Sequence, residues 1–261
     1  MTETALVTGA SGGIGYELSK RFAEDGYDLV IAARSEDKLE KIADEFEDEH
    51  GVSVTVLPKD LSVPGAPDEL YDEVADEDIE VNFLVNNAGI GTHGRFHESD
   101  LNGELDLLNL NVVTPTHLTR RFLNDMVGDG GEGGKILNVA STAAFQPGPL
   151  MATYYASKAY LLWFSEGIKE ELKGEDVTVT ALCPGPVDTG FQERADMEES
   201  NIAKGSLQDP VKVAEAGYNG MMKGKTMVIP GMRYKILPLL VRLTPRRVTR
   251  KIAMRINRSS E

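Results

Sequence analysis

The sequence predicts an α/β fold, a doubly wound parallel sheet of about seven strands in a single domain. Short runs rich in Val, Ile and Leu alternate with longer stretches that have the spacing of amphipathic helices. This alternation is typical of parallel strands whose connecting helices cover both faces of a sheet. No change of composition, no linker rich in Pro, Gly or Ser and no internal repeat divides the chain, so we expect one domain.

The expected elements follow one another in regular order. The strands are short, largely apolar runs, and they are expected at 5–9, 28–33, 53–58, 82–89, 135–141, 177–185 and 226–231. The helices place apolar residues three and four positions apart. They are expected at 17–26, 36–50, about 101–127 and 153–173.

Composition and charge narrow the functional classes. The chain has 261 residues, enough for a sizeable core, and its apolar content of 41% is too high for a disordered protein. A formal net charge of −15 makes the chain a poor partner for DNA or RNA phosphates, so nucleic-acid binding is not expected. The single cysteine, Cys183, excludes an intrachain disulfide and a cysteine-based metal cluster.

The start of the chain and its hydropathy bear on localisation. The opening residues, MTETAL, have neither the basic nor the apolar region of a signal peptide. No apolar run reaches the roughly 18 residues needed to span a bilayer. We therefore expect a soluble, cytoplasmic protein.

The charge is unevenly distributed. Residues 233–261 hold nine basic side chains and one acidic one, a net charge of +8, which leaves 18 basic and 41 acidic residues, or −23, for residues 1–232. Much of the acidic excess lies in the helical stretch at 35–50. This stretch is either an ordinary solvated helix face or an adaptation to a cytoplasm of molar salt, in which repulsion between carboxylates is screened. We favour salt adaptation.

A glycine-rich turn, TGASGGIG at residues 8–15, joins the first strand to the first helix. In this position such a loop binds a pyrophosphate, because glycines let the backbone approach the phosphates and the helix N-terminus offers free N–H groups. Gly9, Gly13 and Gly15 would be the essential glycines. Tight turns also need glycine for their backbone conformation, but a place in the first strand–helix unit favours dinucleotide binding.

The end of the second strand indicates which dinucleotide is bound. An acidic residue there bonds the ribose 2′-hydroxyl of NAD, whereas an arginine accommodates the 2′-phosphate of NADP. Here the strand ends in Ala32, Ala33 and Arg34, with no carboxylate before Glu36. Arg34 could simply cap a surface turn, but we predict a preference for NADP(H).

Taken together, the motifs resemble the short-chain dehydrogenase/reductase family. The likeness runs from about residue 4 to residue 231. It rests on TGASGGIG, NNAG (86–89), Asn111, Ser141, YYASK (154–158) and PGPVDT (184–189), in that order. The resemblance implies a Rossmann-type fold and an oxidoreductase that interconverts a carbonyl compound and a secondary alcohol. It also implies a small-molecule substrate and a homo-oligomer, either a dimer or a tetramer.

Two adjacent tyrosines compete for the catalytic position. The family pattern is Tyr-x-x-x-Lys, with a serine about a dozen residues earlier. Tyr154 fits, because Lys158 follows four residues later and Ser141 precedes it by thirteen, whereas Tyr155 would need a lysine where Ala159 stands. We therefore predict that Tyr154 is the catalytic tyrosine.

The expected chemistry is general acid–base catalysis. A free tyrosine has a pKa near 10, and a neighbouring lysine ammonium favours the phenolate. Tyr154 would give its proton to the carbonyl oxygen during reduction while Ser141 hydrogen-bonds that oxygen. By resemblance, Lys158 also holds the nicotinamide ribose, and Asn111 supports a water chain to the lysine. Each residue could have a purely structural role, but all four at family spacing behind a dinucleotide loop favour an enzyme.

The remaining cofactor contacts are implied by the resemblance. Asp60 would bond the adenine amine, residues 87–89 would line the adenosine side, and residues 184–189 would wrap the nicotinamide. The implied set is Gly9, Ser11, Gly13, Ile14, Gly15, Arg34, Asp60, Leu61, Asn87, Ala88, Gly89, Tyr154, Lys158, Pro184, Gly185, Val187 and Thr189. One departure is Gly12, where NADP-preferring members often carry a basic residue, so specificity would depend on Arg34, assisted by Ser11.

Neither a metal nor a specific substrate is indicated. The four histidines, His50, His93, His97 and His117, lack metal-ligand spacing. By family resemblance, residues 189–210 form a mobile substrate loop, and their polar, glycine-containing composition suits a flexible lid. Phe145, Met151 and Phe191 could line an apolar pocket or belong to the core. An alternative function is a catalytically idle dinucleotide-binding regulator or scaffold, although such proteins typically lose the Tyr or the Lys.

The basic segment 233–261 is expected to be a helical tail outside the main domain of residues 1–232. Thr244 followed by Pro245 suits the start of a helix. Apolar residues recur every four positions among basic ones, at Val248, Ile252 and Ile256.

Two partners fit such a helix. It could dock on the acidic body of the protein or on a second subunit, or it could contact anionic lipid as a peripheral membrane surface. We favour docking.

Overall fold

The computed structural model describes residues 2–127, 133–195, 197, 200–201 and 205–258. Its strands form one sheet in the order β3-β2-β1-β4-β5-β6-β7, and every neighbouring pair is parallel. The strands are β1 (Thr4–Thr8), β2 (Asp28–Ala33), β3 (Val54–Pro58), β4 (Val81–Asn86), β5 (Gly134–Val139), β6 (Val177–Leu182) and β7 (Met227–Val228). The predicted α/β class with a parallel sheet is confirmed.

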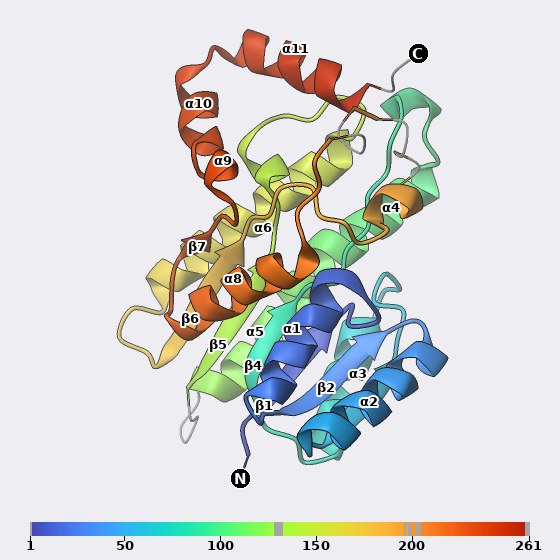
Figure 1. The fold of residues 1–261 in the computed structure, drawn as a ribbon, viewed down its shortest axis with the longest axis vertical. Coiled ribbons are helices and arrows are strands. Elements are labelled where there is room, and N and C mark those ends of the chain that lie inside the picture. Colours follow the sequence, from blue (N-terminus) through green and yellow to red (C-terminus); the bar gives the residue numbers. More distant parts are fainter. Residues whose placement is uncertain (1, 128–132, 196, 198–199, 202–204, 259–261) are drawn as a thin grey trace.

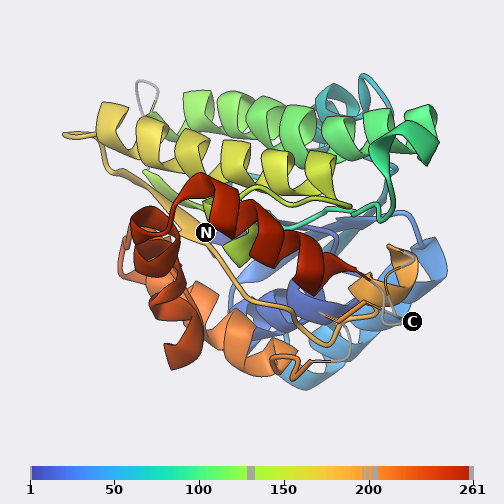
Figure 2. The same cartoon turned by 90° about the horizontal axis from the view of Figure 1, so that it is seen from above.

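Helices cover both faces of the sheet, in the three layers that Figure 2 shows edge-on. One face packs against α1 (Gly13–Glu24), α2 (Glu36–His50) and α8 (Pro210–Met222). The other packs against α3 (Ala66–Asp76), α5 (Thr114–Val127) and α6 (Ala152–Glu171). Shorter helices are α4 (Leu101–Leu108), α7 (Phe191–Arg194), α9 (Met232–Lys235), α10 (Leu237–Leu243) and α11 (Arg246–Asn257).

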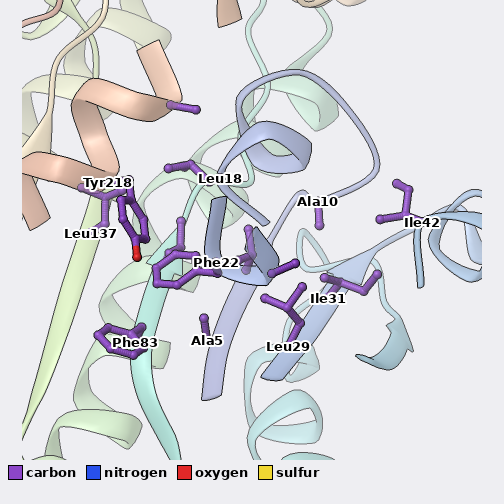
Figure 3. Close-up of a cluster of buried hydrophobic side chains, with 14 of the residues drawn as sticks. Ala5, Ala10, Leu18, Phe22, Leu29, Ile31, Ile42, Phe83, Leu137 and Tyr218 are labelled. Atoms are coloured by element: carbon purple, nitrogen blue, oxygen red, sulfur yellow. The ribbon is translucent and has the colours of Figure 1, made fainter. Parts of the chain in front are cut away.

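The alternation of side chains along the strands builds two cores. In β1, Ala5 and Val7 belong to the cluster under α1 and α8, whereas Leu6 belongs to the opposite cluster. Because both faces of the sheet are covered, successive residues of β1 are apolar and buried on opposite faces. In the first cluster, Phe22 of α1 packs edge-on against Tyr218 of α8, with ring centroids 4.9 Å apart (Figure 3).

Several predicted strands are longer than the observed ones. The predicted strand at 82–89 ends at Asn86, the one at 135–141 ends at Val139, and the one at 177–185 ends at Leu182. The residues beyond these ends leave the sheet at its carboxyl edge and become loops. Apolar composition alone does not distinguish the last residue of a strand from the loop that follows it.

The predicted helix at 101–127 is interrupted. A π-helical turn, Asn109–Val113, separates α4 from α5, a feature that often marks a functional site. Asn111 lies in this turn and is buried. The periodicity of the sequence predicted a continuous helix, because a single wider turn hardly changes the spacing of the apolar residues.

The tail is helical, as predicted, but its first helix begins earlier. Thr244 ends α10 instead of starting the next helix, and its hydroxyl donates a hydrogen bond to the carbonyl of Leu240 at 2.7 Å. Pro245 then precedes α11 without a side-chain cap. Figure 1 shows α9, α10 and α11 beyond the carboxyl ends of the strands, at the end of the molecule opposite the N-terminus. Among the described residues, none of the helices has the length and apolarity needed to cross a bilayer.

Candidate active site

A cavity of about 790 Å³ lies at the carboxyl ends of the strands, the edge at which open α/β sheets bind their ligands. Its volume is in the range of small-molecule and cofactor sites. The loops that follow β1 to β6 line it, and so does the C-terminal tail. All of the predicted catalytic and cofactor-binding residues line this cavity except Gly15 and Asn111.

The glycine-rich turn forms one end of the cavity. Gly9 (φ 68°) and Gly13 (φ 56°) both adopt the left-handed conformation that favours glycine. Helix α1 begins after Gly12 without a side-chain cap, so its first N–H groups are available to an anion in the cavity. A Cβ atom on Gly13 would lie 2.8 Å from the side chain of Thr189, which lines the facing wall.

Gly15 has a packing role instead of a lining role. A Cβ atom at this position would lie 2.2 Å from the carbonyl oxygen of Gly9 and 2.5 Å from Nδ2 of Asn87. A side chain at residue 15 would therefore displace the turn itself. The sequence predicted that this glycine is essential. In the structure, its lack of a side chain lets the start of α1 lie close to the end of β1.

Asn87 ties the ends of the two central strands together. Its Nδ2 donates hydrogen bonds to the carbonyls of Thr8 at 2.9 Å and of Gly9 at 3.1 Å. The backbone N–H groups of Asn87 and Ala88 donate to the Thr8 hydroxyl at 3.0 and 3.1 Å. Sequence reasoning missed Thr8, although its place at the first residue of the glycine-rich motif was a signal.

Basic residues gather at the end of β2. Arg34 lines the cavity and is exposed, and two residues that the sequence analysis missed, Ser35 and Lys38, line it as well. Lys38 lies in the first turn of α2, four residues after Arg34, so both cations reach the same end of the cavity. The four-residue spacing could have indicated this pair.

Asp60 faces the same region and is held in the ionised form. Its Oδ1 accepts hydrogen bonds from the backbone N–H of Ser62 at 3.0 Å and from the Ser62 hydroxyl at 2.7 Å. Burial raises the pKa of Asp60, but these hydrogen bonds and the charge of Arg34 outweigh it, so its pKa is lowered overall.

Tyr154, Lys158 and Ser141 converge at the other end of the cavity. Tyr154 and Lys158 lie in the first two turns of α6, and Ser141 directly follows β5. The Lys158 ammonium donates a hydrogen bond to the carbonyl of Val139 at 2.9 Å and lies 5.9 Å from the centroid of the Tyr154 ring. The structure thus brings these three predicted catalytic residues together.

Burial has the largest effect on the pKa values of Tyr154 and Lys158. It raises the pKa of Tyr154 to about 12, although a hydrogen bond with Ser141 lowers that pKa in part. Burial also lowers the pKa of Lys158 to about 8. From the sequence we expected the lysine ammonium to lower the pKa of Tyr154. The net shift of this pKa is upward instead, because Tyr154 is removed from water.

Asn111 lies behind the cavity wall. Its amide side chain pairs with the backbone of Ile90, accepting from N–H at 3.0 Å and donating to C=O at 2.9 Å, and its Nδ2 also donates to Ser157 at 3.1 Å. A Cβ atom on Gly89 would lie 3.1 Å from Oδ1 of Asn111 and 3.3 Å from Nζ of Lys158. Asn111 therefore makes the local backbone contact considered in the sequence analysis and also lies close to the lysine.

The hydroxyl of the neighbouring Tyr155 is bonded to the C-terminal tail. Its hydroxyl donates a hydrogen bond to Oδ1 of Asn257 at 3.0 Å, and Nδ2 of Asn257 donates to the carbonyl of Pro149 at 2.8 Å. The Tyr155 ring lies against Gly148, where a Cβ atom would be only 2.1 Å away. This hydrogen bond ties the Tyr155 hydroxyl to α11.

The wall next to Tyr154 is apolar. Met151 and Phe191 line it, as considered from the sequence, together with Met197, and the Phe191 ring lies 5.3 Å from the Tyr154 ring. Phe145 has the other role considered from the sequence, since it packs in the small core cluster around Ala140 and does not line the cavity.

Parts of the predicted substrate loop lie outside the described residues, namely 196, 198–199 and 202–204. The described part includes α7. Tail residues complete the wall, and these were missed: Tyr234, Leu237 and Ile256. No local sequence pattern connects them with a site more than 70 residues earlier.

Metal-binding groups are lacking in the part of the chain that the structure describes, where no three His, Cys, Asp or Glu side chains could share an ion. Cys183 is buried beneath the site, and burial raises the pKa of its thiol to about 12. A thiol in this state is unreactive.

Comparison with known proteins identifies the family. Residues 3–200 match the sequence profile of the short chain dehydrogenase family. The chain belongs to this family. The family and the fold predicted from the sequence are both confirmed.

Two curated relatives show the extent of the likeness. The very-long-chain 3-oxoacyl-CoA reductase of Anas platyrhynchos is 32% identical over 212 residues, which cover 79% of this chain and 64% of the relative. The human 17-beta-hydroxysteroid dehydrogenase type 3 is 32% identical over 198 residues, which cover 73% of this chain and 61% of the relative. The chain therefore spans less than two thirds of the length of these relatives.

A solved structure matches over nearly the full length of both chains. The short-chain dehydrogenase from Sphingobium yanoikuyae, in complex with NADPH, superposes with a TM-score of 0.82 at 30% identity. The match covers 92% of this chain and 93% of the other. The arrangement of sheet, glycine-rich turn and α6 is thus that of the family.

Proposed function

We propose that the protein is an NADP(H)-dependent oxidoreductase that interconverts a carbonyl compound and a secondary alcohol. The observation that carries this proposal is the convergence of Tyr154, Ser141 and Lys158 on one wall of a cavity that extends to the glycine-rich turn. The cavity thus has a place for a dinucleotide at one end and proton-handling groups at the other.

The residues present fit a nicotinamide dinucleotide. The uncapped start of α1 would bind the pyrophosphate, and Asp60 would accept a hydrogen bond from the adenine amine. Arg34 and Lys38 would pair with the 2′-phosphate of NADP, and the relative from Sphingobium yanoikuyae holds NADPH. When bound, the cofactor supplies or accepts the hydride.

Tyr154 would act as the general acid in reduction. A pKa of about 12 keeps its hydroxyl protonated at neutral pH, so the proton is available to a carbonyl oxygen that gains negative charge. Ser141 would donate a second hydrogen bond to that oxygen. Lys158, whose pKa is lowered to about 8, would exchange protons near neutral pH and return one to the tyrosine. Asn111 would fix the backbone at Ile90 beside the lysine.

The proposed substrate is a ketone carried on a large apolar body. Met151, Phe191 and Met197 form an apolar wall beside Tyr154, and Leu237 and Ile256 of the tail continue it. The curated relatives carry names that refer to 3-oxoacyl-CoA and hydroxysteroid substrates, both of which place a carbonyl or hydroxyl on a large apolar framework.

A second copy of the chain is proposed to cover one exposed face. Large apolar side chains are exposed along α4, the π-helical turn and α6, which pack side by side. They are Leu101, Leu105, Leu108, Val113, Tyr160 and Trp163. A contiguous apolar patch of this kind marks an interface. Light scattering checks this assignment, with a dimer or tetramer expected and a monomer contradicting it.

Oxidation of NADPH, followed by absorbance against a panel of steroid ketones, 3-oxoacyl thioesters, small aldehydes and quinones, tests the function. We expect turnover with the bulky ketones and its loss in Tyr154→Phe. Binding of NADPH without turnover of any of these classes would instead support the binding-protein alternative.

A further inference from the structure

The C-terminal helices carry a surface that the proposed reaction does not use. Helices α9, α10 and α11 lie beyond the carboxyl edge of the sheet, and Figure 1 shows α10 and α11 at the outer edge of the molecule. We call their outward side the tail surface. It consists of the exposed apolar residues Met232, Ile236, Leu239, Leu240, Leu243, Val248 and Ile252 and the exposed cations Lys235, Arg242, Arg246, Arg247, Arg250, Lys251, Arg255 and Arg258.

Its apolar side chains are largely exposed. Helix α10 reads LPLLVRL, yet none of its residues is buried. Leu239, Leu240 and Leu243 are 58%, 56% and 74% exposed, and Met232 is 76% exposed. Scattered apolar residues are ordinary on a protein surface, but a cluster on adjacent helices marks an interaction site.

Its cations are not neutralised by the acidic body. All eight are exposed, and none takes part in an ion pair among the described residues. The body of residues 1–232 carries a net charge of −23, whereas residues 233–261 carry +8. The contact of the tail with the body therefore does not depend on ion pairs among the described residues.

Helix α11 contacts the body through a different face. Its buried residues are Thr249, Ala253 and Asn257, and Asn257 hydrogen-bonds to Tyr155 and Pro149. Asn201 donates hydrogen bonds to the carbonyls of Arg255 and Arg258. Val248 and Ile252 are 45% and 50% exposed, so this part of the apolar stripe remains outside. The attachment thus leaves an apolar and strongly basic surface directed away from the protein.

We propose that the tail surface docks on a membrane surface rich in anionic lipid. Contact between two copies of the tail surface would bring two sets of cations together, which is unfavourable. Anionic headgroups instead attract the arginines and lysines, while the leucines of α10 enter the boundary of the acyl chains. The exposed apolar residues elsewhere, such as Leu105 and Trp163, belong to the face assigned to a second copy.

Sedimentation with vesicles tests this proposal on the full-length protein. Vesicles of phosphatidylglycerol and phosphatidylcholine are compared with vesicles of phosphatidylcholine alone. Because each cation near an anionic surface contributes favourably, we expect at least about tenfold stronger binding to the anionic vesicles. A wild-type protein that remains in the supernatant with both vesicles would overturn the proposal.

Two pairs of variants assign the binding to this surface. Leu239→Ser with Leu243→Ser removes apolar contact, and Arg247→Glu with Lys251→Glu reverses charge. Each pair should weaken vesicle binding by about tenfold or more. Phe96→Ser and Lys212→Glu are the matched controls, since these residues are also strongly exposed but lie outside the tail. Equal binding by the tail variants and the wild type would overturn the assignment.

The same proteins distinguish a second copy from lipid. Light scattering without vesicles measures the oligomeric state of the wild type and of Leu239→Ser/Leu243→Ser. We expect the same state for both, because the tail surface faces lipid. A smaller assembly in the variant would show that a second copy covers this surface, and would contradict the membrane proposal.

Discussion

The hydroxyl of Tyr155 donates a hydrogen bond to Asn257, 102 positions later in the chain, at 3.0 Å. Asn257 is fully buried, and it also donates to the carbonyl of Pro149. Its own carbonyl oxygen lies 2.7 Å from Nε2 of His93. Three contacts therefore join the end of α11 to Tyr155, Pro149 and His93.

Replacement of this residue, Asn257→Ala, should release the tail. The substitution leaves the Tyr155 hydroxyl and the Pro149 carbonyl without partners, which costs about 1–3 kcal/mol. We expect a lower melting temperature and faster proteolytic cleavage after residue 232. Asn219→Ala, at an exposed position of α8, is the control and should resemble the wild type. Unchanged proteolysis of the Asn257 variant would show that the contacts of Asn257 do not hold the tail.

Cofactor preference should depend on the cations at the end of β2. Arg34→Asp removes an attraction for the 2′-phosphate and adds a repulsion, so the ratio of kcat/KM for NADPH over NADH should fall by about tenfold or more. Lys38→Asp should act in the same direction. Lys41→Asp is the control, because this exposed lysine of α2 does not line the cavity. Equal effects of all three substitutions would indicate a general loss of charge instead of a phosphate site.

Stability near pH 9 should report the burial of Lys158. Its folded pKa, about 8, lies below the unfolded value, so the unfolded chain binds more protons between about pH 8 and 10 and stability rises with pH in that window. Below pH 8 the folded protein bears the cost of a buried ammonium. Lys158→Met should therefore raise the free energy of unfolding at pH 7 by about 1–3 kcal/mol.

Denaturant titration from pH 7 to pH 9.5 measures this effect. The stability gain of Lys158→Met over the wild type should shrink as pH rises. The window stops short of the region in which the raised pKa of Tyr154, about 12, makes stability fall with increasing pH. A difference between the two proteins that does not change with pH would contradict the assigned pKa of the lysine.

The acidic surface should make stability dependent on salt. With a net charge of −15, repulsion between carboxylates is relieved as KCl is added, so we expect the melting temperature to rise up to molar KCl. Glu40→Lys with Asp44→Lys, both exposed on α2, should flatten this dependence. A wild-type melting temperature indifferent to KCl would contradict salt adaptation.

Local patterns predicted most of the site. The spacing of Tyr154 and Lys158 places them on one side of a helix, and Gly9 and Ser141 follow strands that end at the same edge of the sheet. These positions depend on neighbours in sequence and on a regular topology. The net rise of the Tyr154 pKa was not predicted, because it is caused by burial and the motif does not indicate how deeply the tyrosine is buried.

The contacts of the tail with the body could not be predicted from the sequence, for a physical reason. Periodicity at Val248, Ile252 and Ile256 correctly indicated a helix, but it did not indicate which side of the helix contacts the body. The buried side is instead chosen by hydrogen bonds from Asn257 to residues more than a hundred positions away. Contacts at such separation leave no local pattern, and the same holds for Tyr234 and Ile256 in the cavity wall.

The central claim concerns which of two adjacent tyrosines transfers the proton. Tyr154→Phe and Tyr155→Phe should be compared in NADPH-dependent turnover of a bulky ketone, with NADPH binding measured in parallel. We expect Tyr154→Phe to bind NADPH and to lose about 100-fold or more of kcat, and Tyr155→Phe to retain kcat within about tenfold. Loss of turnover in Tyr155→Phe together with retention in Tyr154→Phe would contradict this account.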